Sequence, residues 1–163
     1  MERRSFLQLM LATAASAVFA PWNMAKAFAA EMIEKLTLSD EEWKKRLTAQ
    51  QYDILRHEGT EAPFSSALNN EHRAGMFACA GCGLDLFPSK FKFDSGTGWP
   101  SFFDSLPGHI ETKTDYKLIA PRTEYHCAKC GGHHGHVFND GPKPTGLRYC
   151  NNGAVLNFIA GKA

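Results

Sequence analysis

The sequence predicts a mainly β protein: a small antiparallel β-sheet or barrel-like domain with a helical pair before it. Two observations predict this class. After Pro63, short runs of β-branched, aromatic and other apolar residues alternate with turns rich in glycine and proline. Before Pro63, two helix start signals stand close together. Hydrophobic residues (44%) and charged residues (21%) have the proportions of a folded chain, which excludes a disordered one.

Two capping boxes predict where the helices begin. Ser39 is followed three residues later by Glu42, and Thr48 by Gln51. In this pattern the N-cap hydroxyl accepts a hydrogen bond from a backbone N–H of the first turn, and the later side chain bonds back to the N-cap. The second helix is expected to end near Gly59. The apolar residues of this helical pair are Trp43, Leu47, Tyr52, Ile54 and Leu55.

Five segments of the second half have the composition of strands. Each is short, and turn-rich segments such as 94–96 and 140–142 separate them. No internal repeat or long helical periodicity interrupts this pattern. The predicted strands are residues 75–79, 90–93, 116–119, 123–127 and 154–159.

Residues 1–29 have the organisation of an export signal peptide, which leaves residues 30–163 as the domain. A basic pair, Arg3-Arg4, precedes an uncharged stretch over 5–25, and two small-x-small cleavage sites follow. The Arg-Arg-Ser-Phe-Leu run resembles the twin-arginine signal, which exports folded proteins. We expect an exported, periplasmic protein. The alternative is an uncleaved segment that anchors the protein to the membrane, facing the periplasm.

The charge of the chain argues against a nucleic-acid partner. Removing residues 1–29 takes away three basic residues and Glu2, so the net charge changes from +1 to −1. No basic stripe remains to neutralise a phosphate backbone. We therefore expect no nucleic acid, and contact with a membrane only through the signal segment if it is uncleaved.

Four of the five cysteines form two Cys-x-x-Cys pairs, Cys79/Cys82 and Cys127/Cys130, with 44 residues between them. Each pair sets two thiolates on one side of a tight turn, and two such turns complete a tetrahedron around Zn²⁺. A glycine follows each pair, which suits a positive φ. These cysteines predict a closed, structural zinc site. Two local disulfides are the alternative in an oxidising compartment, whereas a thioredoxin-type pair lacks its βαβ surroundings.

The fifth cysteine, Cys150, has no partner cysteine. If residues 147–152 are extended, Arg148, Cys150 and Asn152 share one face. A guanidinium beside a thiol favours the thiolate, which is the reactive form, so we expect Cys150 to be ionised. The alternative is a small buried hydrophobe, as most free cysteines are. Three histidines within residues 133–136 would add proton donors near neutral pH.

Four motifs in one order resemble the zinc-containing methionine-R-sulfoxide reductase family of the MsrB type, over roughly residues 36–160. Residues 94–102 (DSGTGWPSF) are similar to the GWPSF segment of that family. Residues 133–142 (HHGHVFNDGP) are similar to its HxGHVFxDGP segment, and residues 148–152 (RYCNN) to its R-[YF]-C-x-N segment. The two Cys-x-x-Cys pairs stand in the matching places.

The resemblance implies thiol-dependent reduction of methionine-R-sulfoxide to methionine. Cys150 would attack the sulfoxide sulfur and become a sulfenic acid. His133 and His136, helped by Asn152, would bind and protonate the sulfoxide oxygen. A regular strand would not set both histidines on one face, so a bend or bulge at Gly135 is expected.

The resemblance also implies supporting roles around this centre. Arg148 and Asp140 would support the thiolate and the imidazoles, and Trp99 would hold the methyl group of the substrate. Many relatives carry a second, resolving cysteine at the position of Thr97 here. We therefore expect the sulfenic acid on Cys150 to be reduced by an external thiol, such as that of a thioredoxin-like protein.

An exported location makes oxidised proteins of the cell envelope the expected substrate. A zinc-ribbon interaction module is the competing class. It would explain the Cys-x-x-Cys pairs and leave Cys150 inert, but it would not explain the motifs around Trp99 and over 133–136. A third possibility is a reductase that has lost its activity, although Thr97 is the one departure from the motifs.

Overall fold

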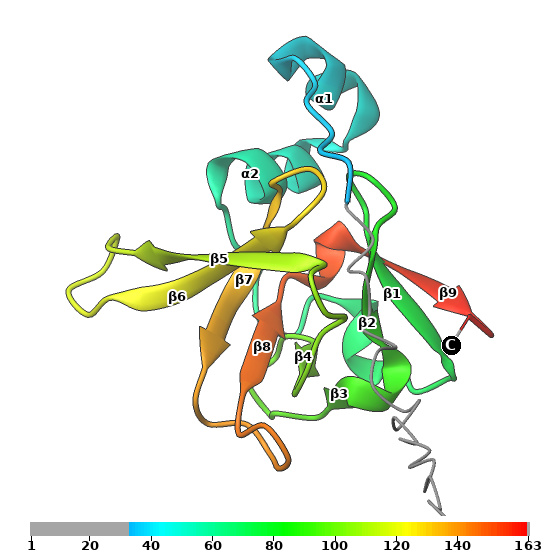
Figure 1. Ribbon diagram of the computed structural model, residues 1–163, viewed down its shortest axis with the longest axis vertical. Helices are drawn as coiled ribbons and strands as arrows, with labels where there is room; N and C mark the ends of the chain where they lie inside the picture. The colour runs from blue at the N-terminus through cyan, green and yellow to red at the C-terminus, as the bar shows by residue number, and fades with distance from the viewer. Residues whose placement is uncertain (1–32, 163) are drawn as a thin grey trace, which may run out of the picture.

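The computed structural model describes residues 33–162 of the protein. The predicted export segment, 1–29, lies outside the described residues. Among those described, no helix has both the length and the apolar composition needed to cross a membrane. Two helices come first and short antiparallel strands follow (Figure 1). The prediction of a mainly β protein with an N-terminal helical pair is confirmed.

The bounds of the elements are as follows. The helices are α1 (Asp40–Arg46) and α2 (Ala49–His57). The strands are β1 (Gly75–Cys79), β2 (Asp85–Pro88), β3 (Lys92–Phe93), β4 (Ser101–Phe102), β5 (Ile110–Asp115), β6 (Arg122–Cys127), β7 (His133–Phe138), β8 (Arg148–Asn151) and β9 (Leu156–Ala160). Three short 3₁₀ turns are η1 (Ala67–Asn70), η2 (Ser89–Phe91) and η3 (Gly153–Val155).

Both helices begin at the predicted capping boxes. The Ser39 hydroxyl accepts a hydrogen bond from the Glu42 backbone N–H at 3.3 Å, and the Glu42 carboxylate accepts one from the Ser39 N–H at 2.8 Å. Thr48 begins α2 in the same way. The chain leaves α2 at Glu58, whose φ of 57° is left-handed, one residue before the predicted end at Gly59. The capping side chains thus determine where each helix begins.

The strands form two open antiparallel sheets. The smaller sheet has the order β2-β1-β9, and the larger has the order β3-β4-β8-β7-β6-β5. Strand β8 lies in the middle of the larger sheet, between β4 and β7. Its Cys150 therefore has one neighbour on each side in the ladder, Ser101 on β4 and His136 on β7.

Aromatic side chains fill the space between the two sheets. Phe77 and Phe87 come from the smaller sheet, and Phe102 comes from the larger one; all three are fully buried. The ring of Phe102 stacks on Phe87 with 4.3 Å between centroids and meets Phe77 edge-on at 5.0 Å. Tyr125 of β6 is also fully buried against this cluster. This core packs against the face of the larger sheet that is opposite the Cys150 side chain.

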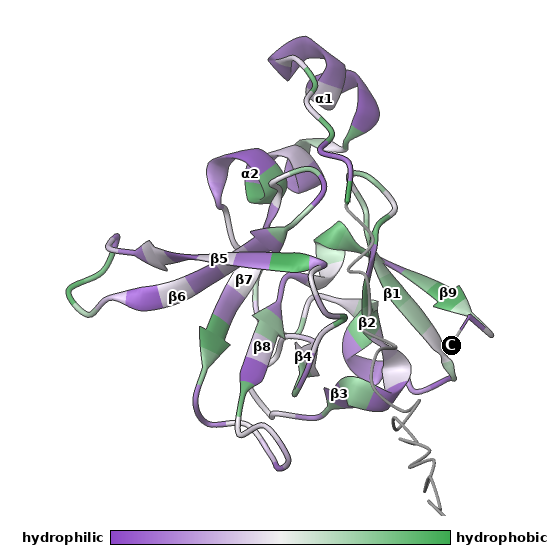
Figure 2. Ribbon diagram, in the orientation of Figure 1, coloured by the Kyte–Doolittle hydropathy of each residue, from purple (hydrophilic) through white to green (hydrophobic). Residues whose placement is uncertain are grey.

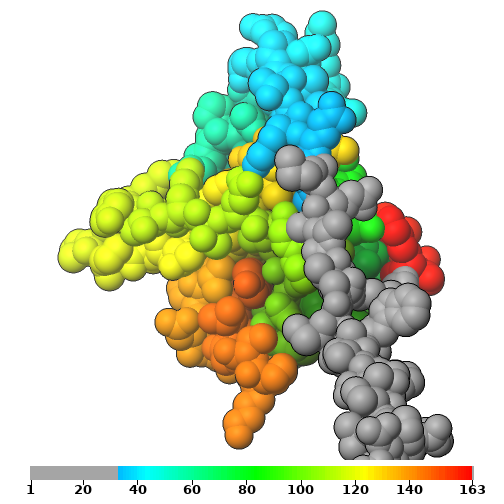
Figure 3. Space-filling model, in the orientation of Figure 1, coloured from blue at the N-terminus to red at the C-terminus, as the bar shows by residue number. Residues whose placement is uncertain are grey.

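The predicted strand at 116–119 is wrong. These residues form the exposed connection between β5 and β6, while the strand itself ends at Asp115. The β5–β6 hairpin projects from the body of the molecule (Figure 3), and its tip is coloured as hydrophobic in Figure 2. Apolar, β-branched composition suggested a strand, but here these side chains face solvent at a loop tip.

Other predicted strands are displaced or shortened. The segment 90–93 contains the end of η2 and only two strand residues, and 154–159 begins within η3 before β9 starts at Leu156. The segments 75–79 and 123–127 are strands as predicted. Strands β2, β4, β5 and β7 were not among the predicted strands, and β8 was considered only as a possible extended segment at 147–152.

Candidate active site and metal site

The four cysteines of the two Cys-x-x-Cys pairs lie together. Their sulfur atoms are all within 4.8 Å of one another. Two of the separations are 3.7 Å, between Cys79 and Cys130, and 3.5 Å, between Cys82 and Cys127. In a tetrahedron with Zn–S bonds of about 2.3 Å, sulfur atoms lie about 3.8 Å apart. The donor set and the spacing therefore fit a zinc site, as predicted.

Both cysteine turns have the same backbone. The N–H of Gly83 donates to the carbonyl of Cys79 at 2.8 Å, and the N–H of Gly131 donates to that of Cys127 at 2.9 Å. The two glycines have φ values of 74° and 67°, in the left-handed region that glycine adopts without strain. The positive φ inferred from the sequence is thus confirmed at both turns.

The cysteine cluster joins the two sheets. One pair lies on the turn after β1 of the smaller sheet, and the other lies on the turn between β6 and β7 of the larger one. The close sulfur pairs run between the turns rather than within one turn, and none is near the disulfide bond length of about 2.05 Å. Two local disulfides are therefore not the arrangement of this structure.

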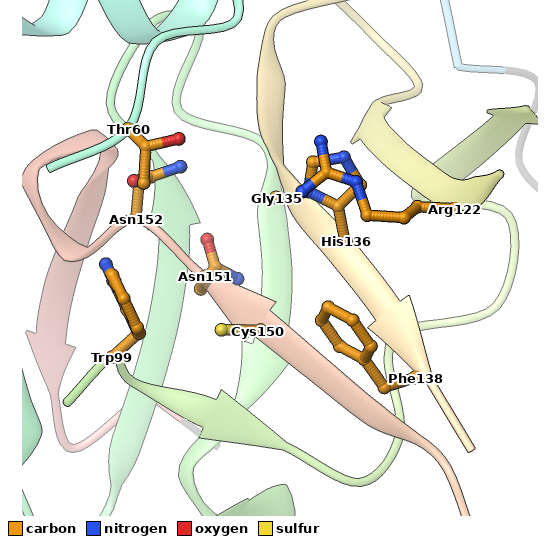
Figure 4. Close-up of a pocket in the computed structure, with 9 residues that line it drawn as sticks. All are labelled: Thr60, Trp99, Arg122, Gly135, His136, Phe138, Cys150, Asn151 and Asn152. Atoms are coloured by element: carbon orange, nitrogen blue, oxygen red, sulfur yellow. The ribbon is translucent and has the colours of Figure 1, made fainter. Parts of the chain in front are cut away.

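A pocket of about 180 Å³ opens on the larger sheet around Cys150. Figure 4 shows the sulfur of Cys150 between the indole of Trp99 on one side and the rings of Phe138 and His136 on the other. Three of the predicted site residues besides Cys150 thus line it: Trp99, His136 and Asn152. The full lining is Thr60, Trp99, Arg122, Gly135, His136, Phe138, Cys150, Asn151 and Asn152.

The charge state of Cys150 differs from the sequence expectation. Burial raises the pKa of the Cys150 thiol, and the Arg148 guanidinium together with a hydrogen bond from Thr97 offsets this only in part. The guanidinium acts in the expected direction, but desolvation outweighs it. In this structure Cys150 is therefore mainly a thiol, and a thiolate has to form during the reaction.

Thr97 belongs to a small hydroxyl network beside Cys150. Its hydroxyl lies 2.8 Å from that of Ser95, which in turn lies 2.8 Å from that of Ser101. Ser101 is the ladder neighbour of Cys150 on β4. The position that would hold a resolving cysteine in many relatives thus carries a hydroxyl, which lowers the pKa of the nearby Cys150 thiol.

A bulge brings the two predicted histidines together. In the β6–β7 ladder Tyr125 pairs with Gly135 and His126 pairs with His133, so His134 is an extra residue. The rings of His133 and His136 meet edge-on with 5.5 Å between centroids. The predicted irregularity is present, immediately before Gly135. His136 lines the pocket, whereas His133 is buried behind it.

Gly135 lets β7 and β8 approach closely at this point. A Cβ atom at this position would lie 1.9 Å from the carbonyl oxygen of Cys150, which no side chain can tolerate. The absence of a side chain therefore fixes the distance between the strand that carries His136 and the strand that carries Cys150.

Two carboxylates that the sequence did not single out hold the histidines. The Glu124 carboxylate lies 2.6 Å from Nδ1 of His133. Burial raises the pKa of Glu124, but the bonds with His126 and His133 outweigh burial and lower that pKa to about 2. Glu124 is therefore an anion in the folded protein, and it raises the pKa of His126.

Asp115 is the carboxylate that binds His136. Its carboxylate lies 2.7 Å from Nε2 of His136 and 2.6 Å from the Arg122 guanidinium. The backbone N–H of Lys117, followed by His136 and Arg122, holds the pKa of Asp115 well below its usual range. Burial lowers the pKa of His136, and the Asp115 carboxylate opposes that effect. Glu124 lies opposite His136 on the neighbouring strand β6, whereas Asp115 lies on β5, one strand further away; no local motif reveals either relation.

His134, the third histidine of this segment, does not line the pocket. It is fully buried beside Tyr125, and its Nδ1 lies 3.2 Å from the side-chain oxygen of Asn151. Since that amide oxygen only accepts, Nδ1 carries the hydrogen, and Nε2 has no partner among the described residues. Burial lowers the pKa of His134 to about 4.

A third unpredicted carboxylic residue, Glu61, fixes two residues of the pocket. Its backbone N–H donates to the side-chain oxygen of Asn152 at 3.0 Å, and its carbonyl accepts from the indole N–H of Trp99 at 3.1 Å. Its carboxylate, which is buried, accepts from the backbone N–H groups of Gly153 (2.5 Å) and Ala154 (2.8 Å). One residue thus ties the segment after α2 to both walls of the pocket.

The remaining predicted pair, Arg148 and Asp140, forms a two-point ion pair. The Nε and Nη2 atoms of Arg148 lie 2.8 and 2.9 Å from the two carboxylate oxygens of Asp140. The guanidinium also stacks over the Phe138 ring at 4.3 Å. The Arg148 guanidinium lowers the pKa of the Cys150 thiol, and the Asp140 carboxylate opposes this effect.

Comparison with known proteins extends these observations. The SelR domain model matches residues 47–160. The peptide methionine sulfoxide reductase MsrB of Leptospira interrogans (serovar Lai) is 54% identical over 121 residues, which cover 74% of this chain and 92% of that protein. The protein of the same name from Bradyrhizobium diazoefficiens is 52% identical over 76% of this chain and 89% of its own length. That from Methanosarcina barkeri is 52% identical over 74% and 85%.

Fold and site together define a thiol-based protein: a two-sheet β domain with four clustered cysteines that could hold a metal, and a fifth cysteine in a pocket of imidazole, indole and amide groups. The match extends over most of the chain and includes every residue of both sites. The chain belongs to the SelR domain family, the MsrB type of methionine sulfoxide reductases.

Proposed function

We propose that this protein reduces methionine-R-sulfoxide in oxidised proteins to methionine, with Cys150 as the nucleophile. The observation that carries the proposal is the pocket in which the Cys150 sulfur faces Trp99 and stands beside His136 (Figure 4). The curated relatives are named as peptide methionine sulfoxide reductases. An interaction module with an inert cysteine would not require this arrangement.

The first step transfers oxygen from the substrate to Cys150. The sulfur of Cys150 attacks the sulfoxide sulfur and forms a sulfur–sulfur bond. This bond and the sulfur–oxygen bond of the substrate then break as the oxygen moves to Cys150, which leaves methionine and a sulfenic acid. The thiol proton ends on that oxygen, so no other proton is consumed. Because the Cys150 pKa is raised, this proton is still present when the substrate arrives. Trp99 supplies an apolar wall for the methyl group.

The histidines carry the proton between the two sulfur centres. His136 is the ladder neighbour of Cys150, and Asp115 stabilises its imidazolium form. His133, paired with Glu124, lies behind His136 and supports it. Asn152 has its side-chain oxygen bonded to Glu61, and one hydrogen of its amide nitrogen bonded to His134. Its second amide hydrogen can donate to the sulfoxide oxygen.

The sulfenic acid on Cys150 is resolved by an external dithiol. Two thiols of the reductant form one disulfide, the sulfenic oxygen leaves as water, and the Cys150 thiol is regenerated. Thr97 provides no sulfur for an internal disulfide, and the other four cysteines lie in the metal cluster. A thioredoxin-like protein has the chemistry that this step needs.

The metal of the four-cysteine cluster is Zn²⁺ in this proposal, with a structural role. Four thiolates and no further donor leave no open coordination position, which is typical of structural zinc. The residues that would hold the ion are Cys79, Cys82, Cys127 and Cys130. The expected content is about one zinc per chain.

The place of action is the periplasm, according to the twin-arginine-like segment at residues 1–29. Sequencing the N-terminus of the mature protein from the producing cell tests this point. Cleavage after residue 27 or 29 is expected. An intact Met1 on a membrane-bound protein would support the anchored alternative.

An assay with separate R and S epimers tests the activity. The wild-type protein is expected to consume the R epimer of a methionine sulfoxide substrate in the presence of a dithiol, and to leave the S epimer unchanged. Cys150→Ser should remove the activity, while Cys82→Ser keeps Cys150 and tests the metal site separately. Activity that survives in Cys150→Ser would contradict the mechanism.

Mass spectrometry after one turnover without reductant tests the resolution step. One oxygen on Cys150, or its product with an added trapping reagent, is the expected result. Thr97→Cys is the matched variant, because it places a thiol beside the Cys150 sulfur and should yield an internal disulfide. A disulfide that includes Cys150 in the wild-type protein would exclude the external route.

A further inference from the structure

A row of three hydroxyl groups lies beside Cys150. Ser101 of β4 is the ladder neighbour of Cys150 on β8, and the two strands lie side by side in Figure 1. Directly paired residues point their side chains to the same face of a sheet, so the Ser101 hydroxyl shares a face with the Cys150 sulfur. The Ser101 hydroxyl lies 2.8 Å from that of Ser95, which lies 2.8 Å from that of Thr97. We call these three hydroxyls the hydroxyl chain.

The loop over residues 94–99 brings two of the three hydroxyls to β4. The Asp94 carboxylate accepts from the backbone N–H of Gly96 at 2.9 Å, and Gly96 has a φ of 68°, in the left-handed region that favours glycine. Ser101 is fully buried, and Ser95 and Thr97 are partly buried. Thr97 does not line the Cys150 pocket, so its hydroxyl leaves the pocket side of the sulfur free.

A backbone carbonyl fixes the direction of the hydrogen bonds in the hydroxyl chain. The Ser101 hydroxyl donates to the carbonyl oxygen of Trp99 at 3.1 Å, and a carbonyl can only accept. Because each hydroxyl has one hydrogen, the hydrogen between Ser101 and Ser95 must come from Ser95. By the same argument, the hydrogen between Ser95 and Thr97 comes from Thr97. The Thr97 oxygen therefore has only lone pairs left to offer to Cys150.

A lone pair on Thr97 suits a protonated Cys150 and not an ionised one. A thiol can donate its hydrogen to a hydroxyl oxygen, whereas a thiolate can only accept. To donate to a thiolate, Thr97 must turn its hydrogen away from Ser95. Ser95 and then Ser101 must turn in the same sense, and Ser101 gives up its bond to the Trp99 carbonyl. This reversal rotates hydroxyl groups and breaks no covalent bond.

We propose that Ser95 and Ser101 are positioning residues that hold the Thr97 oxygen toward Cys150 and keep Cys150 protonated until the hydroxyl chain reverses. The proposal rests on the proposed function only in taking Cys150 as the nucleophile, and it concerns the protein before a substrate binds. The hydroxyl chain carries no proton itself, because the thiol proton leaves through the histidines.

After the reversal, the hydroxyl chain supports the ionised sulfur. Thr97 then donates to an anion, and such a charge-assisted hydrogen bond is roughly twice as strong as a neutral one. The Thr97 hydroxyl accordingly lowers the pKa of Cys150, as a donor to the ionised sulfur does. The same three residues thus resist ionisation at rest and stabilise the thiolate once it has formed.

The other charged and titratable groups around Cys150 are separate from the hydroxyl chain. Arg148 is paired with Asp140, and His136 faces Cys150 from β7. The Tyr125 hydroxyl donates to the backbone carbonyl of Cys150 at 3.3 Å. Among the described residues, none of these side chains has a hydrogen bond with the hydroxyl chain. Changes in the chain should therefore leave their direct effects on Cys150 in place.

Alkylation of Cys150 by iodoacetamide, followed against pH without substrate, tests the proposal because its rate reports the thiolate fraction. Ser95→Ala interrupts the chain but keeps Thr97, so ionisation no longer costs the bond to the Trp99 carbonyl. The rate near pH 7 should rise by about twofold to tenfold, which corresponds to about one hydrogen bond. Ser101→Ala should act in the same direction. Thr97→Val removes the donor to the thiolate, so the rate should fall by about threefold.

Two further variants separate positioning from a structural role. Thr97→Ser keeps the hydroxyl and should restore the wild-type rate. The double variant Ser95→Ala/Thr97→Val should match Thr97→Val, because Ser95 acts on the sulfur only through Thr97. Ser105→Ala, in the loop after β4, is the control and should leave the rate unchanged. Thermal unfolding of every variant shows whether the fold is kept.

The sign of the effect in Ser95→Ala decides the outcome. A rate that falls, as in Thr97→Val, would show that the hydroxyls only stabilise the thiolate, and the proposal would be wrong. An unchanged rate in Ser95→Ala and Ser101→Ala would show that the chain does not act on the sulfur, which also overturns it. Since no substrate is present, a protein that fails to reduce methionine sulfoxide would contradict the proposed function and not this result.

Discussion

The carboxylate of Glu61 is expected to control the orientation of Trp99 and Asn152 without touching the substrate. In Glu61→Gln the side-chain amide can accept from only one of the two backbone N–H groups that it now caps, Gly153 and Ala154. An unpaired buried N–H costs about 1–3 kcal/mol, so the loop should shift to rescue it. We expect kcat/KM for the R epimer to fall by about tenfold, mainly through KM.

Steady-state kinetics and thermal unfolding of the same samples check this prediction. Glu71→Gln is the control, since Glu71 pairs with Arg73 at the surface, away from the pocket. A variant of lower stability whose kinetic constants are unchanged would show that Glu61 serves the fold alone.

His134 is expected to make the protein sensitive to acid. Its folded-state pKa of about 4 lies below the ordinary value of 6.5, so protons bind the unfolded chain first. The stability due to the neutral imidazole is complete above pH 6.5 and is lost as the pH falls toward 4. A shift of this size corresponds to about 3 kcal/mol. Nearby His133 and Glu124 also act on this imidazole, in opposite directions.

Urea unfolding at pH 7.5 and pH 5 measures this effect. His134→Leu removes the titrating group and the partnerless Nε2 atom, so its free energy of unfolding should fall less between the two pH values than that of the wild type. His72→Gln, at an exposed histidine, should behave like the wild type. Equal pH dependence in His134→Leu and the wild type would show that other groups cause the acid sensitivity.

At the level of residues, the sequence predicted those groups of the site that belong to local motifs. Cys150, Trp99, His136 and Asn152 gather around the pocket as expected. Asp115, Glu124 and Glu61 were missed, because each acts across the sheet or from a distant loop and no spacing in the chain reveals such a contact. The rise in the pKa of Cys150 was also missed. The sequence shows that Arg148 is near, but it does not show that the thiol is buried.

The β5–β6 hairpin acts as an element of the site through its root. In Asp115→Asn the neutral amide no longer stabilises the imidazolium of His136, so the pKa of His136 should fall further. We expect kcat to fall by about tenfold to a hundredfold, with the loss of activity on the alkaline side moved to lower pH. The pH profile of kcat distinguishes this effect from a general loss of structure. Glu41→Gln, on α1, is the control.

A profile that keeps its shape in Asp115→Asn while the rate falls at every pH would contradict this role. It would indicate that Asp115 only ties Arg122 to the hairpin. Circular dichroism and thermal unfolding of the variant then separate lost chemistry from lost structure.

At the level of elements, strong local signals were reliable and composition alone was not. The capping boxes located both helices to within a residue. Strand β5 was missed because it is an edge strand whose middle residues, Glu111 to Thr114, are polar and exposed. The apolar residues that follow it were mistaken for a strand. Strands β3 and β4 have two residues each, too few for any periodicity.

For the whole molecule, the cysteine cluster is expected to decide stability. It brings the two sheets together, and β7 begins at His133, only three residues after Cys130. Removing the metal with a chelator, or Cys82→Ser, should lower the free energy of unfolding by on the order of 5 kcal/mol. Activity should fall as well, because the cluster holds the first residue of β7, His133, in position. Thermal unfolding with metal analysis measures both.

The Cys150→Ser variant is the control for metal removal. Its metal content and its melting temperature should equal those of the wild type, because Cys150 is not one of the four clustered cysteines. If chelation leaves the melting temperature unchanged, the cluster does not hold the sheets together.

The burial of Cys150 has a consequence for survival under the conditions that create the substrate. Peroxide reacts with ionised sulfur far faster than with a protonated thiol, and repeated oxidation ends in irreversible sulfinic and sulfonic acids. A sulfur that keeps its proton between turnovers is a poor target for the oxidant. A reductase whose cysteine is protonated at rest would therefore stay active while the proteins around it are oxidised. The Cys150 thiol must then lose its proton each time a substrate binds.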